Sequence, residues 1–485
     1  MQLYNTLSRK KETFSPIRSN EVSLYSCGIT AYDYCHIGHA RSAVVFDVLV
    51  RYLRAIGYGV TFIRNFTDID DKIINRANQE GLPWQEIVAK YIAAFHEDMD
   101  AIGIQRATVE PRATEHIDEM LALIGTLITK GKAYATPDGD VYFRVRAFLG
   151  YGKLSGRSVD ELRSGARVAP GEVKEDPLDF ALWKSAKPGE PFWESPWGKG
   201  RPGWHIECSA MSEKYAPLPL DIHGGGQDLV FPHHENEIAQ SEAAVDSPFC
   251  RFWVHNGFVQ VDSEKMSKSL GNFRTIRDIL GLYLPETLRF FLLTRHYRSP
   301  IDFTYDAMDD AEKNLRRIYE TMLLAREELL RSKWSNSPLP GEFTSEYNEQ
   351  EEAWTKAMDD DLNTAAATGH INNLVRLLNR LAEDKAARKS EGAKVLYTRF
   401  LDNMAYWGDI LGLFKLAPAT YLKDLKLSRA NRKGLAVDKV EKLMAERLAA
   451  REAKDYARSD ALRDEMAKLG VAVKDTPQGA VWDIA

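Results

Sequence analysis

The sequence predicts an α/β protein: a Rossmann-like parallel-sheet domain with an insertion, followed by an α-helical bundle and a small C-terminal domain. A strand–helix–strand pattern covers 22–66, short strands with Gly/Pro turns and tryptophans begin at Tyr134, and helical periodicity dominates beyond Thr304. Because 485 residues exceed what one hydrophobic core can hold, we expect separate domains. Their predicted bounds are 1–132 and 221–305 for the two halves of the sheet domain, 133–220 for the insertion, 306–414 for the bundle and 430–485 for the last domain.

The composition indicates a soluble protein of a reducing compartment. Hydrophobic residues make up 44% of the chain and charged residues 28%, and we expect no membrane-spanning segment. Residues Met1–Phe14 are polar and charged, so we expect no secretory signal. Four cysteines do not form a disulfide framework in so long a chain, which favours the cytoplasm. The net charge of −6 does not by itself indicate a nucleic-acid partner.

The first strand–helix–strand unit carries two histidines near the start of its helix. A strand over 22–26 ends at Cys27-Gly28, and a helix is expected from about Ala40 to Ile56, before a parallel strand over 59–66. A strand, loop and helix in this order gather backbone N–H groups and a positive dipole, which suits phosphate. His36 and His39 could donate hydrogen bonds to phosphoryl oxygens there, and a structural or surface pair is the alternative.

Polar residues follow the second strand, over Thr67–Lys72. They lie at the carboxyl end of a parallel strand, where such sheets bind ligands. A helix N-cap with an acidic first turn explains Asp68 and Asp70 equally well. Helices are expected next over Trp84–Met99 and Thr114–Lys130.

A second strand end carries glycines and two potential metal ligands. Asp221–Leu229 runs into a glycine triplet that lets a backbone approach a ligand, although tight turns use glycines routinely, and Asp228 could accept from a ribose hydroxyl. Pro232 can open a helix that places His233 and Glu237 one turn apart, where they could share a metal or form an ordinary surface pair. A zinc-peptidase motif needs a second histidine where this chain has Ile238, so that class is excluded. Since no Cys-x-x-Cys occurs, a zinc site would have to combine distant segments.

The stretch Lys265-Met266-Ser267-Lys268-Ser269 predicts a loop with two ammonium groups. Lys265 and Lys268 could hold a polyphosphate, and a solvated lysine loop is the alternative.

The remainder predicts helices with a basic end. Periodic apolar faces cover Ala307–Arg331, Leu362–Asp384 and Lys394–Leu413, with a polar loop over Ser332–Glu342. Lys415–Lys433 has no clear periodicity and is interpreted as a linker, Val437–Leu469 as a helical pair, and the end through Trp482 as extended. From Lys423 to Lys474 there are 14 Lys and Arg against 9 Asp and Glu, a local charge of +5 that suits phosphate or a solvated helix face with ion pairs.

The histidine and lysine stretches together resemble the HIGH and KMSKS signatures of class I aminoacyl-tRNA synthetases. With them, Cys27–Thr30, Thr67–Lys72, Gly203–Met211 and His223–Gln240 make the whole chain resemble the cysteinyl-tRNA synthetase family. The resemblance implies a catalytic domain, a helical bundle and a C-terminal anticodon-binding domain. It also implies ligation of L-cysteine to tRNA(Cys) through a cysteinyl-adenylate, with ATP and Mg²⁺, by a monomer that holds one zinc ion.

The resemblance further implies site residues. It assigns zinc to Cys27, Cys208, His233 and Glu237, and the amino-acid pocket to Thr67 and Trp204. It places Gly225 and Asp228 by the adenosine, and His36, His39, Lys265 and Lys268 by the phosphates. It places Arg451, Tyr456 and Asp460 on the helix that reads the anticodon, where many family members carry Trp in place of Tyr456.

Zinc would explain the selection of cysteine over serine. A plain pocket separates such near-isosteres only ~100-fold, whereas zinc deprotonates a coordinating thiol. Two alternatives remain: a cysteine:amino-sugar ligase of the mycothiol type, which would not need the C-terminal domain, and a non-catalytic RNA- or zinc-binding relative. We interpret Cys35 and Cys250 as small buried hydrophobic residues.

Overall fold

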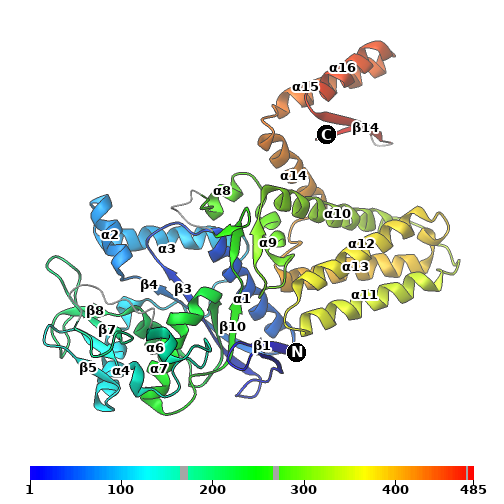
Figure 1. Cartoon of the computed structure of the whole chain (residues 1–485). Helices are drawn as coiled ribbons and strands as arrows, with labels where there is room; N and C mark the ends of the chain where they lie inside the picture. Colours follow the sequence, from blue (N-terminus) through cyan, green and yellow to red (C-terminus); the bar gives the residue numbers. More distant parts are fainter. Residues whose placement is uncertain (164–172, 266–271, 477–478, 485) are drawn as a thin grey trace. The chain divides into compact units, whose positions relative to one another are not determined.

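A computed structural model of the chain describes residues 1–163, 173–265, 272–476 and 479–484 (Figure 1). It divides into two compact units. Unit 1 comprises Met1–Ile276, Leu292–Thr304 and Glu352–Thr368, and unit 2 comprises Arg277–Phe291, Tyr305–Glu351 and Gly369–Ala485. None of the described helices is both long enough and apolar enough to cross a membrane.

A four-stranded parallel sheet organises unit 1, in the order β10-β9-β3-β4. Its strands are β3 (Glu21–Thr30), β4 (Gly59–Thr67), β9 (Leu220–Gly226) and β10 (Cys250–Asn256). Helix α1 (Ile37–Ala55) connects β3 to β4 and buries Val44, Val48 and Leu49. The predicted β-α-β unit and parallel sheet are therefore confirmed, and the carboxyl ends of all four strands meet at one edge.

Strand β3 does not end at Cys27-Gly28 as expected. Its pairing with β4 shifts register between Ser26 and Ile29, so that Cys27 and Gly28 lie opposite the single residue Asn65. A Cβ on Gly28 would lie 1.6 Å from the Asn65 carbonyl oxygen, so only glycine fits this bulge. A bulge next to a site re-aims a side chain, here that of Cys27.

The other helices of the N-terminal half lie close to their predicted positions. Helix α1 begins at Ile37, three residues before the expected start, because His36 serves as its N-cap. The further helices are α2 (Asp71–Glu80), α3 (Trp84–Ala101) and α4 (Ile117–Thr129). Asp70 caps α2 by accepting from the Lys72 N–H at 2.8 Å, as the N-cap alternative predicts.

The insertion forms an antiparallel sheet in the order β5-β6-β7-β8. Its strands are β5 (Ala133–Ala135), β6 (Val141–Phe143), β7 (Phe180–Ser185) and β8 (Gly200–Pro202), and a short helix α5 (Val159–Arg163) precedes β7. Helix α6 (Trp204–Tyr215) then returns to the parallel sheet, where Ile206 and Cys208 share one hydrophobic core with Tyr25 and Ile63.

The remainder of unit 1 consists of irregular turns before α7 and two small sheets. A 3-10 turn over Gln227–Leu229 and an irregular turn over Val230–His234 precede α7 (Glu235–Val245), so Pro232 does not open a regular helix. A small sheet follows, of β11 (Val259–Val261), β12 (Glu264–Lys265) and β13 (Ile301–Phe303). At the N-terminus, β1 (Gln2–Asn5) pairs with β2 (Lys10–Thr13).

The helical region contains a long helix, α11, that the sequence analysis missed. The long helices are α10 (Tyr305–Leu329), α11 (Gly341–Asp359), α12 (Thr364–Glu383) and α13 (Glu391–Leu411), after the shorter α8 (Ile276–Leu280) and α9 (Pro285–Leu293). Helices α10, α12 and α13 confirm three predictions and lie side by side (Figure 1). Helix α11 buries Phe343, Tyr347, Trp354 and Met358, a helical spacing that the acidic residues between them obscured.

The linker prediction for Lys415–Lys433 is wrong, because α14 occupies Pro418–Arg432. The helix buries Pro418, Tyr421, Leu425 and Ala430 between polar residues, and specific partners hold it in addition. Tyr421 stacks on Tyr319 of α10 with ring centroids 3.8 Å apart, and Arg432 pairs with Glu312 at 2.8 Å.

The C-terminal end agrees with its prediction. Helices α15 (Val437–Glu452) and α16 (Tyr456–Lys468) form the expected pair, and β14 (Val471–Thr476) and β15 (Gly479–Ile484) form an antiparallel hairpin. Their small core includes Val440, Leu462, Met466 and Trp482.

Candidate active site and metal centre

Four side chains from distant segments meet at the carboxyl edge of the sheet. Cys27 lies on the β3 bulge, Cys208 on α6, His233 before α7 and Glu237 on α7. Their ligand atoms all lie within 4.8 Å of one another, and we call them the Cys2HisGlu quartet. The Cys27 and Cys208 sulfurs are 3.8 Å apart, and Glu237 Oε1 lies 3.5 Å from Cys27 Sγ and 3.0 Å from His233 Nε2.

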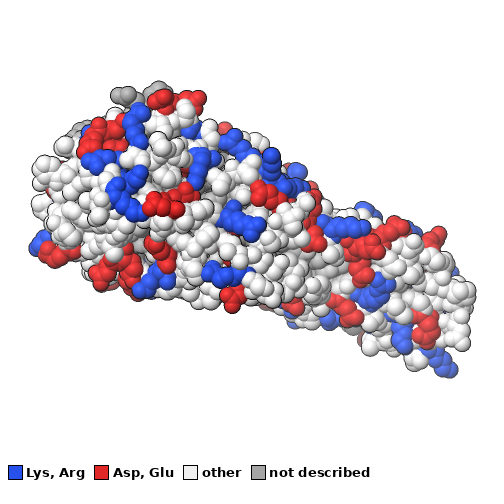
Figure 2. Space-filling view, turned by 90° about the horizontal axis from the view of Figure 1, so that it is seen from below, with Lys and Arg blue, Asp and Glu red and all other residues white. Residues whose placement is uncertain are grey.

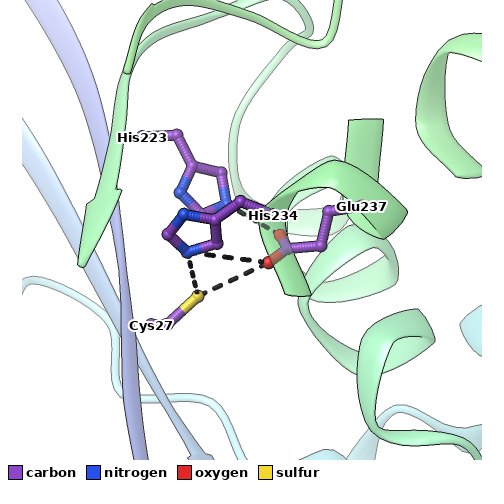
Figure 3. Close-up of side chains that lie close together, drawn as sticks. All are labelled: Cys27, His223, His234 and Glu237. Carbon is purple, nitrogen blue, oxygen red and sulfur yellow. Dashed lines mark hydrogen bonds and ion pairs between the residues drawn. The ribbon is translucent and has the colours of Figure 1, made fainter. Parts of the chain in front are cut away.

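A second set shares two of these residues. Cys27, His223, His234 and Glu237 also place their ligand atoms within 4.8 Å, and we call them the CysHis2Glu quartet. Figure 3 shows His234 and Glu237 joined to the Cys27 sulfur, and His223 joined to the Glu237 carboxylate. The sequence analysis did not select His223 or His234 as metal ligands, although both stand in a stretch rich in His and Gly.

Hydrogen bonding separates the two sets. His233 Nε2 is buried and forms no hydrogen bond within the described part of the chain, although Glu237 Oε1 is close. His223 Nε2, by contrast, is bonded to Glu237 Oε2 at 2.7 Å, while His234 Nε2 lies 3.3 Å from Cys27 Sγ and its Nδ1 is bonded to His255 Nε2 at 2.8 Å. Because the Glu237 carboxylate occupies His223 Nε2, the Cys2HisGlu quartet is the better fit to zinc, with His223 orienting that carboxylate.

His233 is itself held in place from two sides. Its Nδ1 lies 2.9 Å from His205 Nδ1, so one ring nitrogen donates to the other and Nε2 stays directed at the quartet. The Trp204 indole stacks on the His233 ring with centroids 4.1 Å apart while remaining 39% exposed. Trp204 thus lies between the Cys2HisGlu quartet and the accessible surface.

The centre separates positive and negative charge. The Cys27 thiol donates a hydrogen bond to Cys208 and lowers the pKa of Cys208 to about 6, while burial raises the pKa of Cys27. Burial opposes protonation of His233, but the Glu237 carboxylate and Cys208 outweigh it and raise the pKa of His233 to about 10. A protonated Cys27 and His233 thus face the ionised Cys208 and Glu237.

His36 and His39 form one arrangement at the start of α1. His36 Nδ1 accepts from the Gly38 N–H at 3.0 Å, His39 Nδ1 lies 3.2 Å from the His36 N–H, and the rings stack at 3.8 Å. The chain after the lysine stretch is anchored here, since Ile37 N–H donates to the Arg274 carbonyl and Thr275 bridges His36. Lys268 lies outside the described residues, and the backbone of Lys265 belongs to β12.

The predicted pocket residues surround this edge. Thr67 is buried at the end of β4, and its Oγ1 donates to Glu207 Oε2 at 2.6 Å. The space that a side chain on Gly225 would need is filled by Leu229 and His234. Asp228 is exposed on the turn that follows β9, and Asp68 accepts two hydrogen bonds from Thr114.

The predicted anticodon residues lie in or near α16. Tyr456 is its first residue and is 63% exposed, and Asp460 is exposed one turn later. Arg451 pairs with Asp475 at 2.5 Å.

Other arginines of the basic end are also paired. Arg429 and Arg432 contact Glu312, Arg447 contacts Asp475, and Arg458 contacts Glu446. Internal ion pairs thus account for much of the local positive charge.

Comparison with protein families divides the chain into three matched regions. Residues 13–313 match "tRNA synthetases class I (C) catalytic domain", 353–415 match "DALR domain", and 436–482 match "Cysteinyl-tRNA ligase anticodon binding domain".

Relatives match over the whole length. The chain is 68% identical over 485 residues to the cysteine–tRNA ligase of Oleidesulfovibrio alaskensis and 55% identical over 484 residues to that of Lawsonia intracellularis, and each match covers 100% of both chains. Among solved structures, the methionyl-tRNA synthetase of Mycobacterium tuberculosis in complex with methionyl-adenylate is similar with a TM-score of 0.58 at 15% identity, over 87% of this chain and 95% of that chain. At that identity the similarity shows the fold.

Proposed function

Because the chain belongs to the cysteine–tRNA ligase family of class I aminoacyl-tRNA synthetases, we propose that its Cys2HisGlu quartet holds the one zinc ion through which L-cysteine is recognised. The single observation that carries this proposal is the convergence of four ligand atoms within 4.8 Å around a buried, unbonded His233 Nε2. When bound there, zinc supplies a soft Lewis acid that binds a thiolate in preference to a serine hydroxyl.

The protein joins cysteine to tRNA(Cys) in two steps. The cysteine carboxylate attacks the α-phosphorus of Mg²⁺-bound ATP and releases pyrophosphate, and a ribose hydroxyl at the tRNA 3′ end then takes the cysteinyl group. His36 and His39 donate from Nε2 to the phosphoryl oxygens, because their Nδ1 atoms are occupied by backbone N–H groups. Lys265 and Lys268 add positive charge at the phosphates, and Gly225 and Asp228 hold the adenosine.

The remaining residues position the other substrate groups. Thr67 and Trp204 contact the amino acid, and Arg451, Tyr456 and Asp460 read the anticodon, with exposed Tyr456 stacking on an unpaired base. The match of 436–482 to an anticodon-binding domain argues against the amino-sugar ligase, which has no need of one. A reducing cytoplasm suits the four free thiols, and we propose that the protein acts there as a monomer.

A serine scan of two buried cysteines tests the zinc assignment. Cys208→Ser should abolish stoichiometric zinc and reduce cysteine-dependent ATP–pyrophosphate exchange, because serine is a poor ligand at neutral pH. Cys250→Ser is the matched control, since Cys250 is equally buried but belongs to neither quartet. Zinc is measured by elemental analysis of the purified proteins. Normal zinc content and normal cysteine KM in Cys208→Ser would refute the assignment.

A further inference from the structure

Asn256 ends strand β10 at the carboxyl edge of the sheet, and its amide oxygen has no partner. The residue is 4% exposed, and its Oδ1 forms no hydrogen bond within the described part of the chain. The amide nitrogen donates to the Gly257 carbonyl at 3.2 Å, which identifies the remaining amide atom as the oxygen. A buried acceptor without a partner is costly, so a ligand that donates a hydrogen bond to it would be stabilised there.

The sheet register places this amide beside Asp228. Asn256 is the partner of Gly226 on β9, and paired residues of neighbouring strands point to the same side of a sheet. A Cβ on Gly226 would lie 2.4 Å from Asp228 Oδ1, so the Asp228 carboxylate lies on that side. Because neighbouring strands are only ~4.8 Å apart, the two side chains present adjacent acceptors at the ends of β9 and β10.

This side of the sheet is the one that α1 covers. A Cβ on Gly224, two residues before Gly226, would lie 2.6 Å from the Phe46 ring of α1. The start of α1 carries His36 and His39, which are proposed to meet the phosphates of ATP. The two acceptors and the proposed phosphate contacts therefore lie on the same face of the sheet.

The donors of ATP indicate which group reaches Asn256. The nucleoside donates hydrogen bonds through its two ribose hydroxyls and its 6-amino group. One hydroxyl is assigned to Asp228, and the other is its immediate neighbour on the ribose ring, whereas the 6-amino group lies at the far end of the base. Two adjacent acceptors are thus complementary to two adjacent hydroxyls.

We propose that Asn256 accepts a hydrogen bond from the ribose hydroxyl that Asp228 leaves free, so that the two side chains together recognise the cis-diol of ATP. The inference rests on the proposed placement of the adenosine at Asp228. It makes the site selective for ribonucleotides over deoxyribonucleotides.

Four nucleotides and two variants test this contact. Cysteine-dependent nucleotide–pyrophosphate exchange is measured with ATP, 2′-deoxyATP, 3′-deoxyATP and ITP in the full-length wild-type protein, in Asn256→Ala and in Asp228→Ala. Each deoxynucleotide lacks one hydroxyl, and ITP lacks the 6-amino group. Zinc content and thermal unfolding of the variants serve as controls for the fold.

The wild-type protein should use each deoxynucleotide with a kcat/KM about five- to tenfold below that for ATP, because one hydrogen bond is lost. Asn256→Ala should lower kcat/KM for ATP by a similar factor and abolish the preference over one deoxynucleotide. Asp228→Ala should abolish the preference over the other. The preference of Asn256→Ala for ATP over ITP should stay within about twofold of the wild-type value, since no contact to the base is removed.

Three results would overturn the proposal. An equal loss for all four nucleotides in Asn256→Ala would assign the residue a structural role. A changed preference over ITP alone would place the contact at the base. Full-rate use of both deoxynucleotides by the wild-type protein would exclude recognition of the diol without any variant.

The same series distinguishes failure of this inference from failure of the adenosine placement. If neither variant changes any nucleotide preference, Asp228 does not hold the adenosine and both proposals fail. If Asp228→Ala abolishes a preference and Asn256→Ala abolishes none, the placement stands and the role of Asn256 alone is wrong.

Discussion

His39 illustrates how a backbone contact sets the chemistry of a side chain. Its Nδ1 is held by the His36 N–H, and the His36 Nδ1 is held in turn by the Gly38 N–H. A neutral imidazole that accepts at one nitrogen carries its proton on the other. Burial, and to a lesser extent His36, lowers the pKa of His39 well below its usual range, which keeps this ring neutral at physiological pH. The capping contacts of α1 therefore direct Nε2–H groups outward as donors.

Replacement of His39 by two amides tests this account. Asn places a polar atom near the position of Nδ1 and Gln near that of Nε2. His39→Asn should keep the cap but lower kcat for ATP–pyrophosphate exchange about 10²–10³-fold, as loss of a transition-state donor does elsewhere. His39→Gln should recover part of that loss. Steady-state exchange and a thermal unfolding control measure both, and equal kcat in the two variants would contradict the donor role.

Residues that act at the start of an element were easier to predict than residues that meet across elements. The sequence placed His36 and His39 just before a periodic helix, and the structure has them at the start of α1; an N-cap explained Asp70. Glu207 and His223 left no such signal, because their partners Thr67 and Glu237 come from other segments. The Cys2HisGlu ligands were predicted only through family resemblance, since spacing along the chain does not show that β3, α6 and α7 converge.

At the scale of elements, periodicity failed where a short apolar face is surrounded by charged residues. Helix α14 buries Tyr421 and Leu425 one turn apart, and the stacking of Tyr421 and the ion pair of Arg432 add to this face without lengthening the apolar repeat. The C-terminal hairpin is stabilised in a similar way. Arg447 is 4% exposed and binds the Asp475 carboxylate through both terminal nitrogens, at 2.9 and 3.0 Å.

This ion pair predicts acid sensitivity of the hairpin. The hydrogen bond from Arg447, followed by that from Arg451, lowers the pKa of Asp475 to about 2, below about 3.9 in the unfolded chain. A depressed pKa contributes stability above about pH 4 that is lost as the pH falls toward 2. Because Asp475 is 46% exposed, solvent screening limits the contribution to about 1 kcal/mol or less.

Amide hydrogen exchange of residues 471–476 and 479–484 measures this effect. Protection in the wild-type protein should fall severalfold between about pH 5 and pH 2.5, after correction for intrinsic rates. Asp475→Asn should show weaker protection at pH 5 and a smaller pH dependence. The same pH dependence in both proteins would assign the acid sensitivity to other carboxylates.

At the scale of the whole molecule, charge alone did not identify the tRNA partner. Lys and Arg are mixed with Asp and Glu over the face seen in Figure 2, in keeping with a net charge of −6. The local charge of +5 near the end is offset by acids outside that stretch, since Asp475 pairs with Arg447 and Glu312 with Arg432. Recognition of the anticodon is therefore expected to depend on exposed groups such as Tyr456 more than on net charge.

A truncation separates activation of cysteine from tRNA charging. We would end the shortened protein at Gly434. Helix α14 packs on α10 through Tyr421, so a truncation near Phe414 would remove a helix that the bundle needs. The shortened protein keeps both quartets and the α1 histidines, so cysteine-dependent ATP–pyrophosphate exchange should stay within about twofold of the full chain. Charging of tRNA(Cys) should fall at least about a hundredfold in kcat/KM, since each stacked anticodon base contributes ~1–3 kcal/mol.

Tyr456→Ala in the full chain should reproduce part of the charging defect while Tyr456→Trp should not. Charging at the full rate by the shortened protein would show that residues 435–485 do not contribute to tRNA recognition.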